Sequence, residues 1–496
     1  MKRREFVKSI SLVTAALSFP LFSCDQKTQK PNIIYILADD LGYGELGCYG
    51  QRKIRTPNID KLAVEGMRFT QHYSGSPVCA PSRCTLMTGL HTGHSYIRRN
   101  DEAKERGDVW HDPNLEGQRP IPEDAYTIGK MLQKVGYETG AVGKWGLGWT
   151  ESSGAPNKQG FDFFYGYICQ REAHNYYPTH LWKNEKKDML TGNKLFSPHQ
   201  KLPKGKDANE PDTYKPYKGK QYAMDNMAEE AIEFIKRNKE KQFFLYLPFP
   251  VPHMAMQVPD DSLQEYEGLF PEIPYKGQRG YLPHAKPRAA YAAMITRMDR
   301  ELGKIVDLVQ RLKLDNNTLI IFTSDNGTAG GYGGTDPEFF SSSGGLKNYK
   351  GSVYEGGIRV PMIARWKGNI QPGSVTDHIS AFWDVMPTLS ELCDADCPEN
   401  IDGISFLATL LGKKKQQKKH EYLYWEHLQK MQAVRKEDWK GVRLSPQQEI
   451  ELYNLNEDIG ESNNVADTFP DIVEKMKQIM IEGRTESKIH PLRWDK

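Results

Sequence analysis

Residues 76–89 read Ser-Pro-Val-Cys-Ala-Pro-Ser-Arg-Cys-Thr-Leu-Met-Thr-Gly, and this stretch says more about the chain than any other. Pro81 suits the first turn of a helix, and Gly89 suits the left-handed position that follows a helix end. A helix between them would place Cys79 where free backbone N–H groups and the helix dipole favour negative charge. Arg83, one turn later, adds a fixed cation. We therefore expect a short helix that handles an anion at its N-terminus.

The spacing between Cys79 and Arg83 excludes one chemistry. Thiol phosphatases use a Cys-x5-Arg loop that surrounds all the oxygens of the anion, whereas this chain has Cys-x3-Arg and carries Thr at position 85. Direct attack of a thiolate on phosphate is therefore not expected. Taken alone, Cys79 has a simpler alternative, a buried cysteine on an ordinary helix.

Length and composition are those of a globular protein with more than one domain. The 496 residues suffice for two domains and a large core, and 38% are hydrophobic and 26% charged. A formal net charge of +2 gives no global field that would attract nucleic acid or an anionic membrane. We therefore expect no nucleic-acid partner, and any preference for an anionic substrate must come from a local cleft.

The first 24 residues are typical of a targeting segment. A basic start is followed by the apolar run 10–22, which is too short to span a membrane as an ordinary helix. Residues 21–24 (Leu-Phe-Ser-Cys) resemble a bacterial lipobox, and residues 3–8 resemble a twin-arginine export signal. We expect export to the periplasm or, as an outer-membrane lipoprotein, to the cell surface, with a lipid on Cys24 as the only membrane anchor. A plain secretory peptide is the alternative.

Short apolar runs alternate with helical patterns along most of the chain. This alternation predicts an α/β fold with a mostly parallel sheet covered on both faces. Apolar residues at spacings of three and four between 295 and 312 predict one long amphipathic helix. Stretches 150–220 and 261–285, rich in Pro, Gly, Lys and aromatic residues, predict long surface loops of the kind that bind ligands. The predicted buried strands are 32–38, 243–247, 318–323 and 360–366, with a further strand ending at Val142.

The end of the chain has a different pattern. Beyond the basic run 413–419, three strand-like segments are followed by the helical segment 469–482, which predicts a small α+β unit with an antiparallel sheet. The strand-like segments are 421–428, 431–444 and 449–455. We divide the chain into a signal peptide (1–24), a catalytic domain (30–412) and a C-terminal α+β subdomain (413–496).

Acidic and amide side chains follow two of the predicted strands. Asp39 and Asp40 end the first strand, and Asp325 and Asn326 follow strand 318–323. Ligands of doubly wound sheets bind beyond the carboxyl ends of the strands, so these pairs can converge there. Carboxylates packed together would repel one another, and a hard divalent cation removes the conflict; Ca²⁺ or Mg²⁺ suits these oxygens better than zinc. Each pair alone could be an ordinary turn.

Cys79-x-Pro-Ser-Arg83, followed by Thr-Gly, resembles the modification motif of type I sulfatases. In that family the cysteine is oxidised to formylglycine (3-oxoalanine). The resemblance runs from Pro31 to about Asn464 and implies an alkaline-phosphatase-like fold for the large domain. It also implies Ca²⁺ ahead of Mg²⁺, with the residue at position 79 as a further metal ligand. A cytoplasmic formylglycine-generating enzyme is the implied maturation partner.

The same resemblance extends to a set of cationic residues. Lys144 lies in Gly-Lys-Trp-Gly-Leu-Gly, where sulfatases typically carry Gly-Lys-Trp-His-Leu-Gly, with Lys and His holding the sulfate. Here Gly146 replaces that histidine, and we regard His174 as a candidate to fill its place. His253 matches the family's Pro-His element, and Lys350 falls in a block that resembles Leu-Arg-x-x-Lys-Gly…Glu-Gly-Gly-x-Arg-x-Pro.

The resemblance implies sulfate ester hydrolysis. One hydroxyl of hydrated formylglycine would attack sulfur while Ca²⁺ and the cations neutralise the sulfate oxygens, and the second would expel sulfate. His253, helped by Lys350, would protonate the leaving alcohol. Blocks 165–178 and 338–340 look like those of bacterial arylsulfatase- and N-acetylgalactosamine-sulfatase-like glycosulfatases. We therefore expect a sulfated glycan substrate, with galactose or N-acetylgalactosamine sulfate, and treat Arg98 and Arg99 as candidate contacts to neighbouring acidic sugars.

Two other functions stay open. A phosphodiesterase or phosphonate monoester hydrolase of the same superfamily would share the fold, and a surface lipoprotein could bind sulfated glycans without turning them over. A two-metal phosphatase is disfavoured because the sequence reveals no second cluster of His and Asp ligands.

Overall fold

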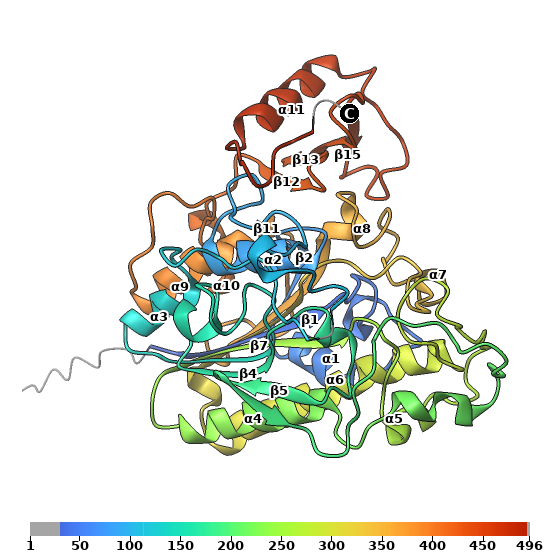
Figure 1. Cartoon of the computed structure of the whole chain (residues 1–496). Helices are drawn as coiled ribbons and strands as arrows, with labels where there is room; N and C mark the ends of the chain where they lie inside the picture. Colours follow the sequence, from blue (N-terminus) through green and yellow to red (C-terminus); the bar gives the residue numbers. More distant parts are fainter. Residues whose placement is uncertain (1–29, 113, 494–496) are drawn as a thin grey trace, which may run out of the picture.

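Four predicted strands lie side by side in the middle of one large sheet (Figure 1). The structure is a computed structural model that describes residues 30–112 and 114–493, so the predicted signal peptide and Cys24 lie outside the described residues. Over the described part of the chain, the strand order is β10-β2-β9-β8-β1-β7-β3-β4-β5-β6, with β11 also paired to β2. The strands of this sheet are β1 (Asn32–Asp39), β2 (Met67–Tyr73), β3 (Glu138–Lys144), β4 (Phe163–Tyr167), β5 (His180–Lys183), β6 (Lys186–Met189), β7 (Phe243–Pro252), β8 (Thr318–Ser324), β9 (Arg359–Arg365), β10 (Ser374–Thr376) and β11 (Ser380–Ala381).

The central strands are apolar runs because both faces of the sheet are covered. Every residue of β1, β7 and β8 is buried. β1 pairs in parallel with β8 on one side and β7 on the other, and β3 continues the parallel order beyond β7. β9 is antiparallel to both β8 and β2. The carboxyl ends of β8, β1, β7 and β3 therefore meet along one edge.

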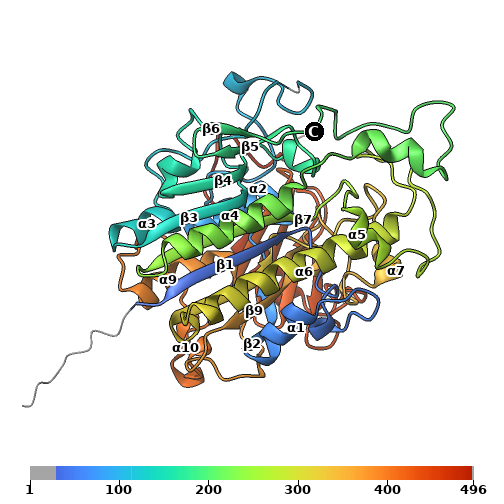
Figure 2. The same cartoon turned by 90° about the horizontal axis from the view of Figure 1, so that it is seen from below.

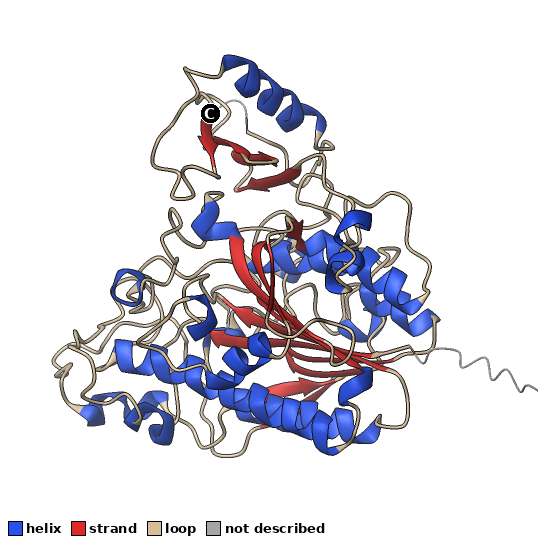
Figure 3. Ribbon diagram, turned by 180° about the vertical axis from the view of Figure 1, so that it is seen from behind, coloured by secondary structure: helices blue, strands red, loops and turns tan. Residues whose placement is uncertain are grey.

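Helices cover both faces of the sheet (Figures 2 and 3). α4 and the long α6 lie across one face, with α1 beside them, whereas α2, α3 and α9 lie on the other. The amphipathic helix predicted between 295 and 312 is the C-terminal part of α6, which begins earlier, at Pro287. The helices of the large domain are α1 (Pro57–Val64), α2 (Cys79–Thr88), α3 (Ile128–Lys134), α4 (Ala223–Arg237), α5 (Asp260–Gln264), α6 (Pro287–Arg311), α7 (Pro337–Phe340), α8 (Glu355–Ile358), α9 (Val385–Cys393) and α10 (Leu407–Leu410).

The prediction of a long surface loop over 150–220 is wrong in part. This stretch contains β4, β5 and β6, which extend the sheet at one edge, and the aromatic side chains of Tyr165 and Tyr167 are buried. β5 pairs antiparallel with both β4 and β6, and no apolar run marks β5 or β6 in the sequence, whereas β4 lies in the short aromatic run 163–168. Stretch 261–285 contains the rest of α5 and is otherwise irregular.

The C-terminal segment forms a separate four-stranded antiparallel sheet, order β12-β13-β14-β15, with α11 beside it (Figure 1). The segment predicted as one strand, 431–444, is two strands joined at a tight turn, where Glu437 adopts a left-handed conformation (φ 53°). The elements are β12 (Leu423–His427), β13 (Met431–Lys436), β14 (Trp439–Arg443), β15 (Glu451–Asn454) and α11 (Pro470–Glu482). In residues 30–493, apart from 113, no helix combines the length and apolar character needed to cross a membrane.

Candidate active site and metal centre

The predicted helix after Val78 is present. α2 begins at Cys79, which follows an extended Val78 (φ −145°, ψ 158°), and Gly89 ends it in the left-handed conformation (φ 72°). All ten residues of the helix are buried. Cys79 therefore stands at the first position of a buried helix, with Arg83 one turn further on, as the sequence predicts.

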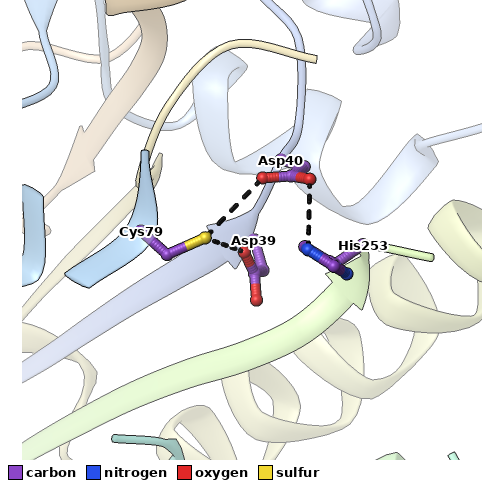
Figure 4. A group of neighbouring side chains, drawn as sticks. All are labelled: Asp39, Asp40, Cys79 and His253. Carbon is purple, nitrogen blue, oxygen red and sulfur yellow. Dashed lines mark hydrogen bonds and ion pairs between the residues drawn. The ribbon is translucent and has the colours of Figure 1, made fainter. Parts of the chain in front are cut away.

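Side chains from the ends of β1 and β7 and from this helix converge at the carboxyl edge of the sheet (Figure 4), and Asp325 at the end of β8 joins them. Cys79 Sγ lies 3.3 Å from Asp39 Oδ1 and 4.0 Å from Asp40 Oδ1. His253, just beyond β7, places Nε2 3.6 Å from Asp40 Oδ2. Asp325 follows β8, and its carboxylate accepts the backbone N–H of Asp40 at 3.1 Å. The convergence arises because β8, β1 and β7 are parallel neighbours.

Each carboxylate in the cluster is paired with a cation. Arg83 Nη2 lies 2.8 Å from Asp325 Oδ2, and Lys144 Nζ lies 2.5 Å from Asp39 Oδ2. Lys350 Nζ lies 2.7 Å from Asp40 Oδ1 and 3.4 Å from Cys79 Sγ. The formal charges of these three carboxylates and three cations cancel, so a bound divalent cation would leave the site positive and suited to an anionic ester.

The donors fit a hard divalent cation. Burial and then the nearby Asp39 raise the pKa of Asp325, even though Arg83 lies beside it. Asn326 donates from Nδ2 to Asp40 Oδ1 at 2.7 Å, while its Oδ1 is buried with no hydrogen-bond partner in the described chain. An orphaned buried carbonyl beside carboxylate oxygens is a ligand set for Ca²⁺ or Mg²⁺.

The thiol of Cys79 is held in its neutral form. Burial and then the carboxylate of Asp39 raise its pKa well above the usual range, despite the nearby Lys144 and Lys350. A thiol that resists ionisation is a poor nucleophile. The side chain of an unmodified Cys79 is therefore unsuited to attack, although its position is central.

Four aromatic residues that sequence reasoning did not combine form a wall beside His253. His174 stacks on His253 with ring centroids 4.5 Å apart, and its Nδ1 lies 2.9 Å from His199 Nε2. Tyr281 lies 5.1 Å from the His174 ring, and Trp110 lies 6.1 Å from it on centroids. The structure thus brings the candidate His174 to the site. His199, Tyr281 and Trp110 lie in irregular loops, where no periodicity signals their position.

Arg98 and Arg99 have other partners. Arg98 is 5% exposed and pairs with Glu426 of β12 at 3.0 Å, so the C-terminal sheet engages its guanidinium. Arg99 donates to Gln429 Oε1 at 3.2 Å. Neither makes a hydrogen bond or ion pair with the described residues of the metal-centre cluster, and their sugar contacts stay predictions.

The structure also brings together a second group of His and Asp side chains, which the sequence did not reveal. Asp402 lies 2.8 Å from His94 Nδ1 and 3.4 Å from His91 Nε2. His91 Nδ1 accepts the backbone N–H of Gly93 at 3.1 Å, so the proton of a neutral imidazole lies on Nε2 and faces Asp402. This arrangement is a hydrogen-bond network rather than a ligand set. The sequence did not reveal this group because Asp402 lies 308 residues after His94.

Comparisons with known proteins agree with this architecture. The family profile named Sulfatase matches residues 31–395, and the profile for the C-terminal part of N-sulphoglucosamine sulphohydrolase matches residues 348–486. N-acetylgalactosamine-6-O-sulfatase of Bacteroides thetaiotaomicron is 30% identical over 93% of this chain and 94% of its own. Human steryl-sulfatase is 32% identical over 80% of this chain and 72% of its own. The solved structure of Ps i-CgsB with k-i-k-neocarrahexaose is 30% identical, has a TM-score of 0.72 and covers 92% of this chain and 93% of its own.

Fold and site together define a hydrolase with an alkaline-phosphatase-like domain, a separate antiparallel C-terminal sheet and a buried acidic site centred on a cysteine. The family match extends over most of the chain. The protein belongs to the sulfatase family and is a sulfuric ester hydrolase.

Proposed function

We propose that the protein removes sulfate from a sulfated carbohydrate, with galactose or N-acetylgalactosamine sulfate as the substrate class. The observation that carries the proposal is the contact of Cys79 with Asp39, Asp40 and Lys350 at the edge of the sheet. Relatives named as N-acetylgalactosamine-6-sulfatases and a structure solved with k-i-k-neocarrahexaose support the substrate class.

The metal and the modification are part of this proposal. Asp39, Asp40, Asp325 and Asn326 would hold Ca²⁺, together with the residue at position 79, and the ion would supply positive charge to the sulfate oxygens. Formylglycine made from Cys79 would supply two hydroxyls on one carbon, one to accept the sulfuryl group and one to expel it. The raised pKa of the Cys79 thiol supports conversion, because the thiol itself would be a weak nucleophile.

The three cations of the site would play different parts in binding the sulfate group. Lys144 and Arg83 are buried and already anchored by Asp39 and Asp325, so they present fixed positive charge to an anion. Lys350 bridges the nucleophile position and Asp40, and its side chain is 18% exposed, which places it nearer the solvent side from which an ester enters.

His253 is the proposed proton donor to the leaving alcohol. Its Nδ1 lies 2.6 Å from the carbonyl oxygen of Met254 and donates to it, so Nε2 is the atom that exchanges a proton. Burial and then Lys350 lower the pKa of His253 to about 4. An anionic sulfate ester beside Nε2 would raise this pKa and favour the protonated imidazole.

The biological setting completes the proposal. Export to the periplasm or cell surface with a lipid on Cys24, and maturation by a cytoplasmic formylglycine-generating enzyme, follow from the N-terminal sequence and the motif around Cys79. The catalytic domain over 30–412 and the C-terminal subdomain over 413–496 remain our division of the chain.

The proposal is tested by release of inorganic sulfate from a panel of defined sulfated monosaccharides and oligosaccharides, alongside phosphodiesters and phosphonate monoesters. We expect sulfate release from galactose or N-acetylgalactosamine sulfates and far slower hydrolysis of the phosphorus esters. Faster hydrolysis of a phosphorus ester would favour the related phosphodiesterase activity. Binding of sulfated glycans without release of sulfate would favour a non-catalytic lipoprotein.

A further inference from the structure

Gln170 fills the space beside Gly146, the position at which this chain departs from the sulfatase motif. Gly146 is left-handed (φ 77°) and lies two residues after Lys144. A Cβ on Gly146 would come within 2.8 Å of Gln170 Cγ and 3.4 Å of its Nε2. The amide of Gln170 therefore occupies the room that a side chain at position 146 would take.

The amide nitrogen of Gln170 lacks a partner. Gln170 is 1% exposed, and its Nε2 is buried without a hydrogen bond to any described residue. A buried amide donor left unpaired costs about 1–3 kcal/mol, so folded proteins rarely retain one without a use for it. An acceptor supplied by a bound ligand would satisfy this nitrogen.

Hydrogen bonds and a ring contact hold the loop that carries Gln170 in place. The backbone N–H of Gln170 donates to Gln118 Oε1 at 2.7 Å. The loop leaves the carboxyl end of β4, whose last residue accepts the N–H of Trp145 at 2.9 Å, and leads to His174, stacked on His253. Gln170 thus lies in the loop between Tyr167, which pairs with Lys144 of the neighbouring strand, and His174 of the aromatic wall.

We propose that Gln170 is a substrate-binding residue whose Nε2 donates a hydrogen bond to an oxygen of the sulfate group. The proposal rests on the sulfatase function and adds a residue to it. Sulfate oxygens only accept hydrogen bonds, and a neutral amide offers them a donor whose charge does not change with pH. The cation Lys144 and the neutral donor Gln170 would then bind the same sulfate group.

The test measures binding of inorganic sulfate by calorimetry and KM for a sulfated sugar. Gln170→Ala removes the donor, and Gln170→Met removes it while keeping the volume. Both variants should weaken sulfate binding and raise KM by about 10- to 100-fold, with a smaller change in kcat. Gln159→Ala is the matched control, because Gln159 is also fully buried but donates to the carbonyls of Pro122 and Ser153.

A swap gives a second readout that a merely structural role would not move. Gly146→His alone should impair binding, because the new side chain collides with Gln170. Gly146→His combined with Gln170→Gly should recover at least tenfold of the lost sulfate affinity, since histidine then supplies the donor. The proposal is overturned if Gln170→Met binds sulfate as tightly as the unaltered protein.

Failure of the sulfatase function would look different. In that case the unaltered protein would release no sulfate from any ester, yet Gln170→Met would still weaken its binding of inorganic sulfate. Sulfate release that persists with an unchanged KM in both Gln170 variants would instead contradict only the role of Gln170.

Discussion

At the scale of single residues, Cys79 is the centre of the proposed reaction. Its side chain touches a carboxylate of β1 and the ammonium of Lys350, yet the environment keeps its thiol protonated. A thiol whose pKa is raised in this way is a weak nucleophile, which supports the proposed modification of position 79.

Cys79→Ala should therefore abolish sulfate release while leaving glycan binding intact. The reason is that other side chains hold the sulfate: Arg83 of the same helix, Lys144 and Lys350. Sulfate release and binding of a sulfated oligosaccharide to the same preparations check this. Cys84→Ala, which alters a buried cysteine on the same helix, should retain turnover. Measurable turnover by Cys79→Ala would refute the assignment.

Glu45 provides a pH-dependent prediction. Burial raises its pKa from the ordinary value of 4.5 to about 7, although Tyr291 O–H and Gly42 N–H donate to it. The protonated form therefore stabilises the fold fully below pH 4.5, and this contribution is lost as pH rises through 7. Glu45→Gln stays neutral, so at pH 8 it should be more stable than the unaltered protein by up to about 3 kcal/mol.

Urea unfolding of both proteins at pH 5 and pH 8 checks the Glu45 prediction. The advantage of Glu45→Gln should be small at pH 5 and large at pH 8. An equal difference at the two pH values would show that Glu45 does not titrate in this range.

Among single residues, the acidic cluster could be predicted and the aromatic wall could not. Asp39, Asp40 and Asp325 follow strands whose parallel order the apolar runs indicate, so their meeting follows from topology. His199 and Tyr281 reach the site through irregular loops, and only tertiary packing places them. Gln170 could not be identified because it lies in an irregular loop that only tertiary packing places beside Gly146.

At the scale of elements, a side chain of α6 caps the N-terminus of α1. The N-cap residue of α1, Thr56, makes no side-chain cap. Instead, Asp299 of α6 accepts the N–H groups of Ile59 at 2.7 Å and Asn58 at 3.2 Å. This contact fixes the start of α1 against the middle of α6.

Asp299→Ala should lower the free energy of unfolding by about 2 kcal/mol, because buried N–H groups at the start of α1 lose their acceptor. Asp299→Asn keeps one acceptor oxygen and should cost less. Urea midpoints measure both effects, and sulfate release should persist, since α1 lies outside the site. Identical midpoints for Asp299→Ala and the unaltered protein would contradict the capping role.

Elements with strong apolar patterns could be predicted from sequence, and weaker ones could not. β1, β7, β8 and β9 follow their predicted runs to within a few residues at one end or the other. β5 and β6 escaped prediction because edge pairing holds them and no hydrophobic run marks them, and β4 escaped because its short aromatic run lies within a stretch rich in Pro, Gly and Lys.

At the scale of the whole molecule, a buried ion group joins the C-terminal sheet to the catalytic domain. Lys440 of β14 lies 2.8 Å from Glu355 and 3.0 Å from Glu461, and all three side chains are buried. Glu355 begins α8, close after Lys350, and Gly351 N–H donates to the carbonyl of Pro77, just before the Cys79 helix. The C-terminal sheet thus supports the segment that carries a site cation.

Lys440→Met should destabilise the protein by about 3–5 kcal/mol, because Glu461 would remain buried without its cation and Glu355 would keep only Arg359. Lys477→Met is the control, since Lys477 pairs with Glu474 at the surface and should cost under about 1 kcal/mol. Urea unfolding measures both, and limited proteolysis near residues 413–420 reports any release of the C-terminal sheet. Equal stability of Lys440→Met and the unaltered protein would contradict this coupling.

Mass spectrometry of the peptide spanning residues 79–89, taken from protein that releases sulfate, tests the central claim most directly. An aldehyde or its hydrate at position 79 is the predicted result. A fully active preparation in which residue 79 is still a thiol would contradict it.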